Sequence, residues 1–204
     1  MWVTGKRVAN SWAHPDENSS VYELKAYVEN VFARLGLHMH DLVVGNLTDD
    51  IYAAGLSVQT RGGKRLATFG IVTKKLLKAF DIDNEVYYAD FNWKELLKAI
   101  RNVKVSYTEI SKFPAVKRDL ALLLDKKVQF AEIEKIAYET EKKLLKEVSL
   151  FDVYEGKNLE AGKKSYAVSF LLQDENATLN DKQIDKIMSK LVTVSYTHLT
   201  LPTT

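Results

Sequence analysis

The sequence contains no cysteine, which excludes disulfide bridges and metal sites built on thiolates. This composition fits a reducing compartment such as the cytoplasm. Long apolar runs are lacking too. The longest run, Leu120–Leu124, is far too short to cross a bilayer, and no basic and apolar leader opens the chain. We therefore expect a cytoplasmic protein with no membrane partner.

An excess of charge of one sign is also missing. The formal net charge of the 204 residues is +2 at pH 7. Residues before Pro114 carry 15 Lys and Arg against 13 Asp and Glu, and the remainder carries 14 of each kind. Neither part is strongly basic, so any nucleic-acid binding has to come from a local surface and not from bulk charge. The length allows two small domains.

Signatures of an independent catalytic site are absent as well. The sequence has no Gly-x-Ser-x-Gly elbow, and the RGGK segment Arg61–Lys64 lacks the spacing of a P-loop. His38, His40 and Asp41 offer two imidazoles and one carboxylate to a metal. No further ligand cluster stands nearby in the sequence, so a surface loop explains them better. We expect no catalytic residue and no metal ligand.

The first predicted domain, residues 1–101, mixes strands with short helices. Apolar residues at helical spacing predict a helix over Val21–Leu35. The glycines of Arg61–Lys64 predict a hairpin between two strand-like runs. Asn92 and Glu95 resemble a capping box at the start of a further helix.

A polar linker, residues 102–112, leads to Pro114 and a second domain, residues 113–191; proline disfavours helix in the residue before it. The second domain has the order strand, helix, strand, strand, helix, with Asn180 and Gln183 at the start of its last helix. An apolar stripe predicts its first helix: Phe130, Ile133, Ala137, Thr140, Leu144 and Val148. This order begins a ferredoxin-like split βαβ fold, in which both helices cover one face of the sheet and leave the other open.

Two strands of this domain alternate apolar and polar side chains, which point to opposite faces of a sheet. One set is predicted to pack under the helices: Phe151, Val153, Tyr166, Val168 and Phe170. The other set is predicted to share the open face, the face that no helix covers: Asp152, Tyr154, Ser165, Ala167 and Ser169. A tyrosine with hydrogen-bonding neighbours on an open sheet is a common platform for unstacked bases.

Several segments resemble a known family. FPAVKRDLALLL, LFDVYEGKNLEAGKKSYAVSF and ATLND are similar to the ferredoxin-like anticodon-binding domain at the C-terminus of bacterial phenylalanyl-tRNA synthetase β subunits. SWAHPDENSSVYELKAYVENV and LATFGIVTKKLLKAFDIDNEVYYADF resemble the end of the catalytic-like domain of these subunits. The resemblance covers residues 1–191. It implies an α+β protein, in which a class II synthetase-like antiparallel sheet domain without chemistry precedes the ferredoxin-like domain.

The resemblance also implies roles for particular residues. In the family, the Asp and Tyr of an F-D-x-Y-x-G motif and the Ser of a G-x-K-S motif contact the first anticodon base. The predicted RNA-binding residues are therefore Asp152, Tyr154 and Ser165, their neighbour Ala167, and, for nearby phosphates, Lys163 and Lys164. Without the resemblance, Asp152 and Ser165 would be ordinary strand residues, and paired lysines in a hairpin are usually only solvated.

A larger assembly is implied by the same resemblance. The intact phenylalanine–tRNA ligase would join phenylalanine to tRNA-Phe with ATP and Mg²⁺, on an α subunit within a hetero-tetramer of two α and two β subunits. This chain would hold no cofactor of its own, pack as a scaffold against the α subunit and recognise the anticodon. The alternative is a regulatory ferredoxin-like module that binds a small ligand.

Residues 192–204 depart from the family pattern. The family ends in a helix, a glycine and a short strand, whereas VTVSYTHLTLPTT is rich in threonine and uncharged. We expect a non-native tail that does not continue the preceding helix. The ferredoxin-like domain would then lack its native last strand, which would leave Leu120–Leu124 at an edge of the sheet.

Overall fold

The structure, a computed structural model, describes residues 1–104, 106–107, 109–157 and 159–199. It divides into two compact units, Met1–Tyr107 and Thr108–Thr204. The division falls inside the segment predicted as a linker. Residues 200–204 of the predicted tail lie outside the described residues. No helix within the described ranges is both long enough and apolar enough to cross a membrane.

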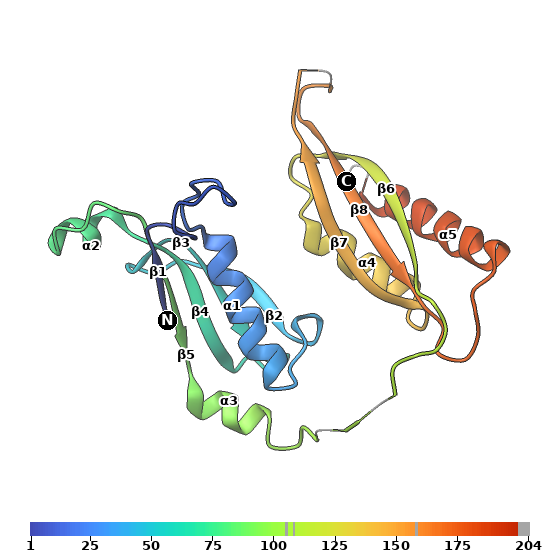
Figure 1. Ribbon diagram of the computed structural model, residues 1–204, viewed down its shortest axis with the longest axis horizontal. Coiled ribbons are helices and arrows are strands. Elements are labelled where there is room, and N and C mark those ends of the chain that lie inside the picture. The colour runs from blue at the N-terminus through green and yellow to red at the C-terminus, as the bar shows by residue number, and fades with distance from the viewer. Residues whose placement is uncertain (105, 108, 158, 200–204) are drawn as a thin grey trace. The chain divides into compact units, whose positions relative to one another are not determined.

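The first unit is a five-stranded antiparallel sheet with a long helix across one face (Figure 1). Its strands, in the spatial order β1-β5-β4-β3-β2, are β1 (Trp2–Thr4), β2 (Val43–Leu47), β3 (Tyr52–Gln59), β4 (Arg65–Val72) and β5 (Val86–Phe91). Its helical elements are α1 (Val21–Arg34), the 3₁₀ turn η1 (Met39–Asp41), α2 (Lys74–Ala79) and α3 (Trp93–Ala99).

Local sequence signals account for these elements. The apolar stripe of α1 places Leu24, Val28 and Phe32 in the core, where all three are fully buried. Between β3 and β4, Gly63 adopts a φ of 77°, which glycine accepts without steric cost. The Asn92 side chain accepts a hydrogen bond from the Glu95 amide at 3.2 Å, which confirms the predicted start of α3.

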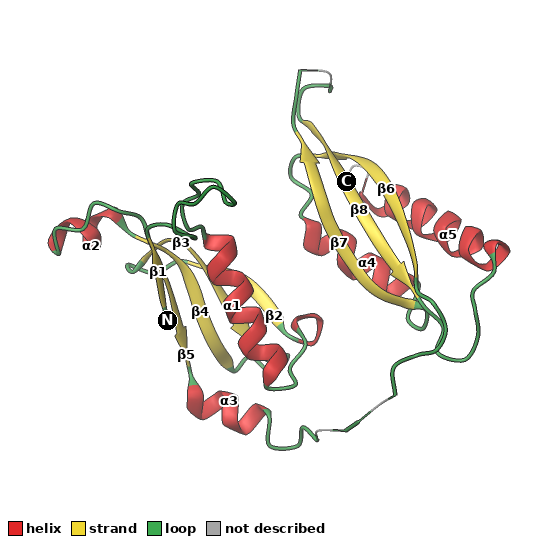
Figure 2. Ribbon diagram, in the orientation of Figure 1, coloured by secondary structure: helices red, strands yellow, loops and turns green. Residues whose placement is uncertain are grey.

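The second unit is a three-stranded antiparallel sheet with both helices on the same side (Figure 2). Its elements are β6 (Val116–Asp125), α4 (Phe130–Thr140), β7 (Leu145–Tyr154), β8 (Lys163–Leu172) and α5 (Asp181–Leu199). The strand order is β6-β8-β7, so β6 is an edge strand in the part of the sheet that the structure describes. Asn180 and Gln183 exchange the two hydrogen bonds of a capping box, as predicted. The mixed fold with antiparallel sheets is confirmed.

The core of the second unit lies between the helices and one face of its sheet. Ile133 of α4 and Ile184 of α5 belong to the same buried cluster as Leu122 of β6 and Phe170 of β8. Since both helices share this cluster, they cover the same face of the sheet, and no helix among the unit's described residues lies on the opposite face.

Two predictions for the helices of the second unit were wrong. Helix α4 ends at Thr140, so Leu144 and Val148 do not extend it; Val148 is a buried residue of β7. A bulge between Leu145 and Glu147 inserts an extra residue into β7, and the resulting spacing of apolar residues imitates a helix. Helix α5 runs on to Leu199, so residues 192–199 continue the helix that was expected to stop before them.

Two adjacent leucines test the predicted division between the covered and the open face. Leu122 is fully buried, whereas the Leu123 side chain is 43% exposed. We expect Leu122→Ala to lower the free energy of unfolding by about 2–5 kcal/mol, through lost burial and a cavity. Leu123→Ala should cost about 0.5 kcal/mol or less. Urea unfolding, followed at the amide signals of β8, measures both. Equal losses for the two variants would contradict this division.

Candidate nucleic-acid interface

The strand register places four of the predicted residues on one face. Asp152 lies opposite Ala167 and Tyr154 lies opposite Ser165 across the β7–β8 pair. Residues that face each other in an antiparallel pair share a side of the sheet. The neighbour Tyr166 is buried in the core under the helices. Asp152, Tyr154, Ser165 and Ala167 therefore lie together on the open face.

The two predicted lysines lie on different faces. Lys163 is on the side of Ser165, and its Nζ lies 3.1 Å from the Asp125 carboxylate. Lys164 is on the helix side and only 6% exposed. Its Nζ donates a hydrogen bond to the Tyr166 hydroxyl at 2.6 Å and lies over that ring. Of these two lysines, Lys163 is thus the one positioned to meet a phosphate at the open face.

Phe151 was predicted to pack under the helices, and this was wrong. A second bulge of β7, between Leu150 and Asp152, leaves Phe151 outside the regular pairing. Its side chain is 56% exposed and takes no part in the core. The Lys117 Nζ lies 5.9 Å from the centre of the Phe151 ring. Because Lys117 is on the open side of β6, the contact places Phe151 on the open face.

Val153 also departs from the prediction, in a milder way. It lies opposite Tyr166 and so belongs to the helix side of β7. The Val153 side chain is nevertheless 47% exposed, because this end of the strand runs beyond the buried cluster. The position of Phe151 could not be predicted, since a bulge leaves no signal in a single sequence. Lys117 was not among the predicted residues, although regular alternation along β6 places it on the open face.

The position of the Tyr154 ring depends on a glycine. A β-carbon on Gly156 would overlap the Tyr154 hydroxyl and ring, so the ring passes directly beside the backbone of Gly156. Tyr154 as a whole is 44% exposed. Beside it, the Lys126 Nζ lies 2.9 Å from the Glu155 carboxylate and holds the pKa of that carboxyl below its usual value by hydrogen bonding. The Glu155 carboxylate, next to Tyr154 in the sequence, is therefore in an ion pair with Lys126.

The centre of the open face carries a second polar contact. The Ser169 hydroxyl donates a hydrogen bond to the Asp119 carboxylate across the β6–β8 pair, and Ser169 is buried. Together with Phe151 and Tyr154, the face offers two exposed rings for stacking and Asp152 and Ser165 for hydrogen bonds. Such a surface suits unstacked nucleobases, with lysines at its edges for phosphates.

The histidine segment provides no comparable site. Met39–Asp41 forms the short turn η1, where the His40 Nε2 lies 3.4 Å from the Asp41 carboxylate. The Arg61 guanidinium lies 3.3 Å from the same carboxylate. In the described ranges, no three His, Cys, Asp or Glu side chains gather as a metal site would require.

Comparisons with known proteins agree with this geometry. Residues 111–200 match the model of the ferredoxin-fold anticodon binding domain, which reaches past Leu191, where the resemblance was expected to end. Residues 1–93 match the model of the phenylalanyl tRNA synthetase beta chain CLM domain.

Two curated relatives are both named phenylalanine–tRNA ligase beta subunit. The chain is 86% identical over 192 residues to the phenylalanine–tRNA ligase beta subunit of Bacteroides thetaiotaomicron, covering 94% of this chain and 23% of the relative. It is 53% identical over 193 residues to that of Porphyromonas gingivalis, covering 95% of this chain and 24% of the relative. The chain thus spans about a quarter of the length of these relatives.

The contact between Gly156 and Tyr154 yields a prediction. In Gly156→Ala the added methyl group should push the Tyr154 ring out of its position without unfolding the sheet, because both residues lie at an exposed strand end. The aromatic proton signals of Tyr154 should shift, while the amide signals of Val168 and Phe170 in the core stay in place. Gly62→Ala, at an exposed turn with room for a β-carbon, is the matched control. Unchanged Tyr154 signals would contradict the close approach.

Proposed function

The chain belongs to the phenylalanyl-tRNA synthetase β-subunit family, and on that premise we propose that its second unit binds the anticodon of tRNA-Phe on the open face. The observation that carries the proposal is the common face of Asp152, Tyr154 and Ser165. The family motif and the strand register select these three residues independently. The alternative of a regulatory small-ligand module is not favoured by the relatives.

In this proposal each side chain has a distinct task. The Tyr154 ring stacks on an unstacked base, an interaction worth on the order of 1–3 kcal/mol. Asp152 and Ser165 hydrogen-bond the edge of that base and so select it. Ala167 lies opposite Asp152, and its small side chain leaves room for the base on the open face. Phe151 offers a second ring, and Lys117 and Lys163 approach the phosphates.

The first unit serves as a scaffold in the same proposal. Its match to the CLM domain supports a class II synthetase-like architecture without chemistry, packed against an α subunit. Phenylalanine would be joined to tRNA-Phe on that subunit, with ATP and Mg²⁺, in a cytoplasmic assembly of two α and two β subunits. In the described part of the second unit's sheet, β6 is an edge strand.

Holding the anticodon would contribute to the reaction by geometry alone. A tRNA fixed at its anticodon has a defined position for its distant acceptor end, and a defined position lowers the entropic barrier to reaction at another site. The second unit therefore acts on the reaction by binding and orienting the tRNA, and none of its residues takes part in the chemistry.

The test compares two RNAs and four proteins. The chain and its variants are titrated with tRNA-Phe and with the same tRNA carrying a substituted anticodon. Tyr154→Ala should weaken binding of tRNA-Phe by roughly 5- to 150-fold and remove the preference for its anticodon. Tyr154→Phe keeps the ring and should retain most of the affinity. Tyr22→Ala, at an exposed tyrosine of the first unit, is the matched control.

Two outcomes would contradict the proposal. One is equal binding of both tRNAs by the unmodified, folded chain. The other is an unchanged anticodon preference in Tyr154→Ala.

A further inference from the structure

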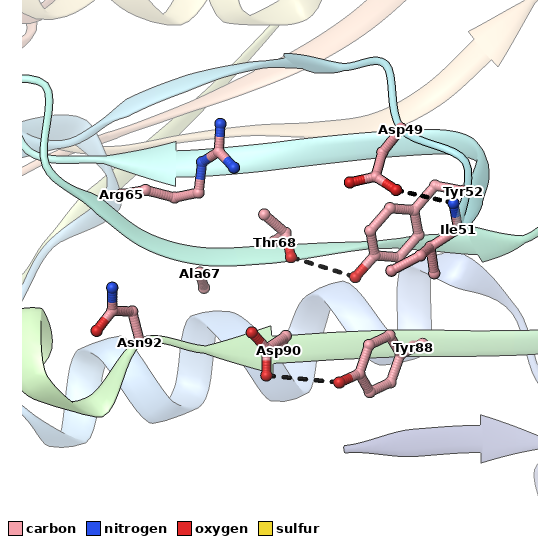
Figure 3. A pocket seen from close by; sticks show the side chains of 9 residues that line it. All are labelled: Asp49, Ile51, Tyr52, Arg65, Ala67, Thr68, Tyr88, Asp90 and Asn92. Carbon is pink, nitrogen blue, oxygen red and sulfur yellow. Dashed lines mark hydrogen bonds between the residues drawn. The ribbon is translucent and has the colours of Figure 1, made fainter.

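The first unit carries a partly open cavity on the face of its sheet that α1 does not cover (Figure 3). Thr68 of β4 lies opposite Asp90 of β5, whereas their neighbours Phe69 and Ala89 lie opposite each other in the core under α1. Side chains alternate along a strand, so the cavity and α1 are on opposite faces. The cavity volume of about 270 Å³ suits a small ligand.

Three charged groups line this cavity without neutralising one another. Figure 3 shows Arg65 toward one end, Asp90 between, and Asp49 toward the other end. Within the part of the chain that the structure describes, none of the three takes part in an ion pair. One guanidinium and two carboxylates give the site a charge of minus one, in the order plus, minus, minus.

Two tyrosine rings form an aromatic wall beside these charges. The Tyr52 and Tyr88 rings are nearly parallel, at 16°, with their centres 6.2 Å apart, and Tyr88 also stacks on Trp2 at 3.9 Å. Burial raises the pKa of both tyrosines, so both phenols stay neutral. The Tyr88 hydroxyl donates a hydrogen bond to the Asp90 carboxylate at 3.4 Å. The wall suits a methylene chain and a cation near its ring faces.

Local hydrogen bonds fix the two ends of the cavity and leave polar atoms for a ligand. At one end, the Asn92 side-chain oxygen accepts from the Glu95 amide at 3.2 Å, so its NH₂ group is the part that remains for an acceptor. At the other end, one Asp49 oxygen accepts from the Ile51 amide at 2.8 Å, and the second oxygen remains for a donor. The ends therefore prefer opposite ligand groups, an anion near Arg65 and a cation near Asp49.

We propose that this cavity binds a free basic α-amino acid, with lysine as the simplest example. Arg65 holds the α-carboxylate through paired hydrogen bonds. Asp90 accepts from the α-ammonium, and Asp49 accepts from the side-chain ammonium. The methylene chain runs along the rings of Tyr52 and Tyr88. The ligand's charges follow the order minus, plus, plus and complement the site. The proposal concerns the first unit and stands apart from anticodon binding by the second.

The test is an NMR titration of the 204-residue chain with L-lysine, followed at the amide signals of Thr68 and Asp90. Three companion compounds each lack one group: cadaverine lacks the carboxylate, Nα-acetyl-L-lysine lacks the α-ammonium, and L-norleucine lacks the side-chain ammonium. Lysine should bind saturably, and each companion should bind roughly 10- to 100-fold more weakly, as expected for one lost charged hydrogen bond.

Two variants assign the groups to residues. Arg65→Gln should bind lysine and cadaverine equally, and Asp49→Asn should bind lysine and norleucine equally. Asp49→Asn keeps an oxygen for the Ile51 amide, so the local turn stays folded. Arg61→Gln, in the exposed turn outside the cavity, should behave as the unmodified chain. Absence of saturable lysine binding, equal binding of cadaverine by the unmodified chain, or unchanged selectivity in Arg65→Gln would overturn the proposal.

Discussion

Both helices of the second unit share one buried cluster with one face of a three-stranded sheet, and every feature of the candidate interface depends on this one-sided packing. The buried face fixes the register, because a slip by one residue would expose Val168 and Phe170 and bury Ser165 in their place. The same register that protects the core therefore holds Asp152, Tyr154 and Ser165 together on the open face. In the proposed function, stability and RNA recognition would therefore use opposite sides of the same strands.

Much of this arrangement could be predicted from local sequence. Hairpin glycines, capping residues and helical stripes each act over a few residues, so their elements were found nearly in place. The misses come mainly from β7, whose two bulges interrupt the alternation that sequence analysis relies on. The first bulge made Val148 resemble a helical residue. The second brought Phe151 to the open face. The two bulges of β7 depend on how this strand pairs with β8, and the sequence of a short segment does not reveal that pairing.

The prediction that Lys164 contacts a phosphate has a different weakness. Strand alternation already separates Lys163 from Lys164, and the structure shows the result: Lys164 lies under the helices, where the Tyr166 hydroxyl and ring receive its ammonium. A lysine next to a serine of the proposed interface is thus not automatically positioned to contact a phosphate. In both units the candidate site lies on the sheet face that the main helices do not cover, which explains why polar and aromatic side chains gather there.

One measurement tests the central claim most directly, that the open face of the second unit receives the anticodon. The amide signals of the chain are followed during a titration with the isolated anticodon stem-loop of tRNA-Phe. The account predicts that the largest shifts occur at Asp152, Tyr154 and Ser165, and that Ile133 and Ile184 in the helices stay unchanged. Shifts confined to the helices, or absent altogether at saturating RNA, would contradict it.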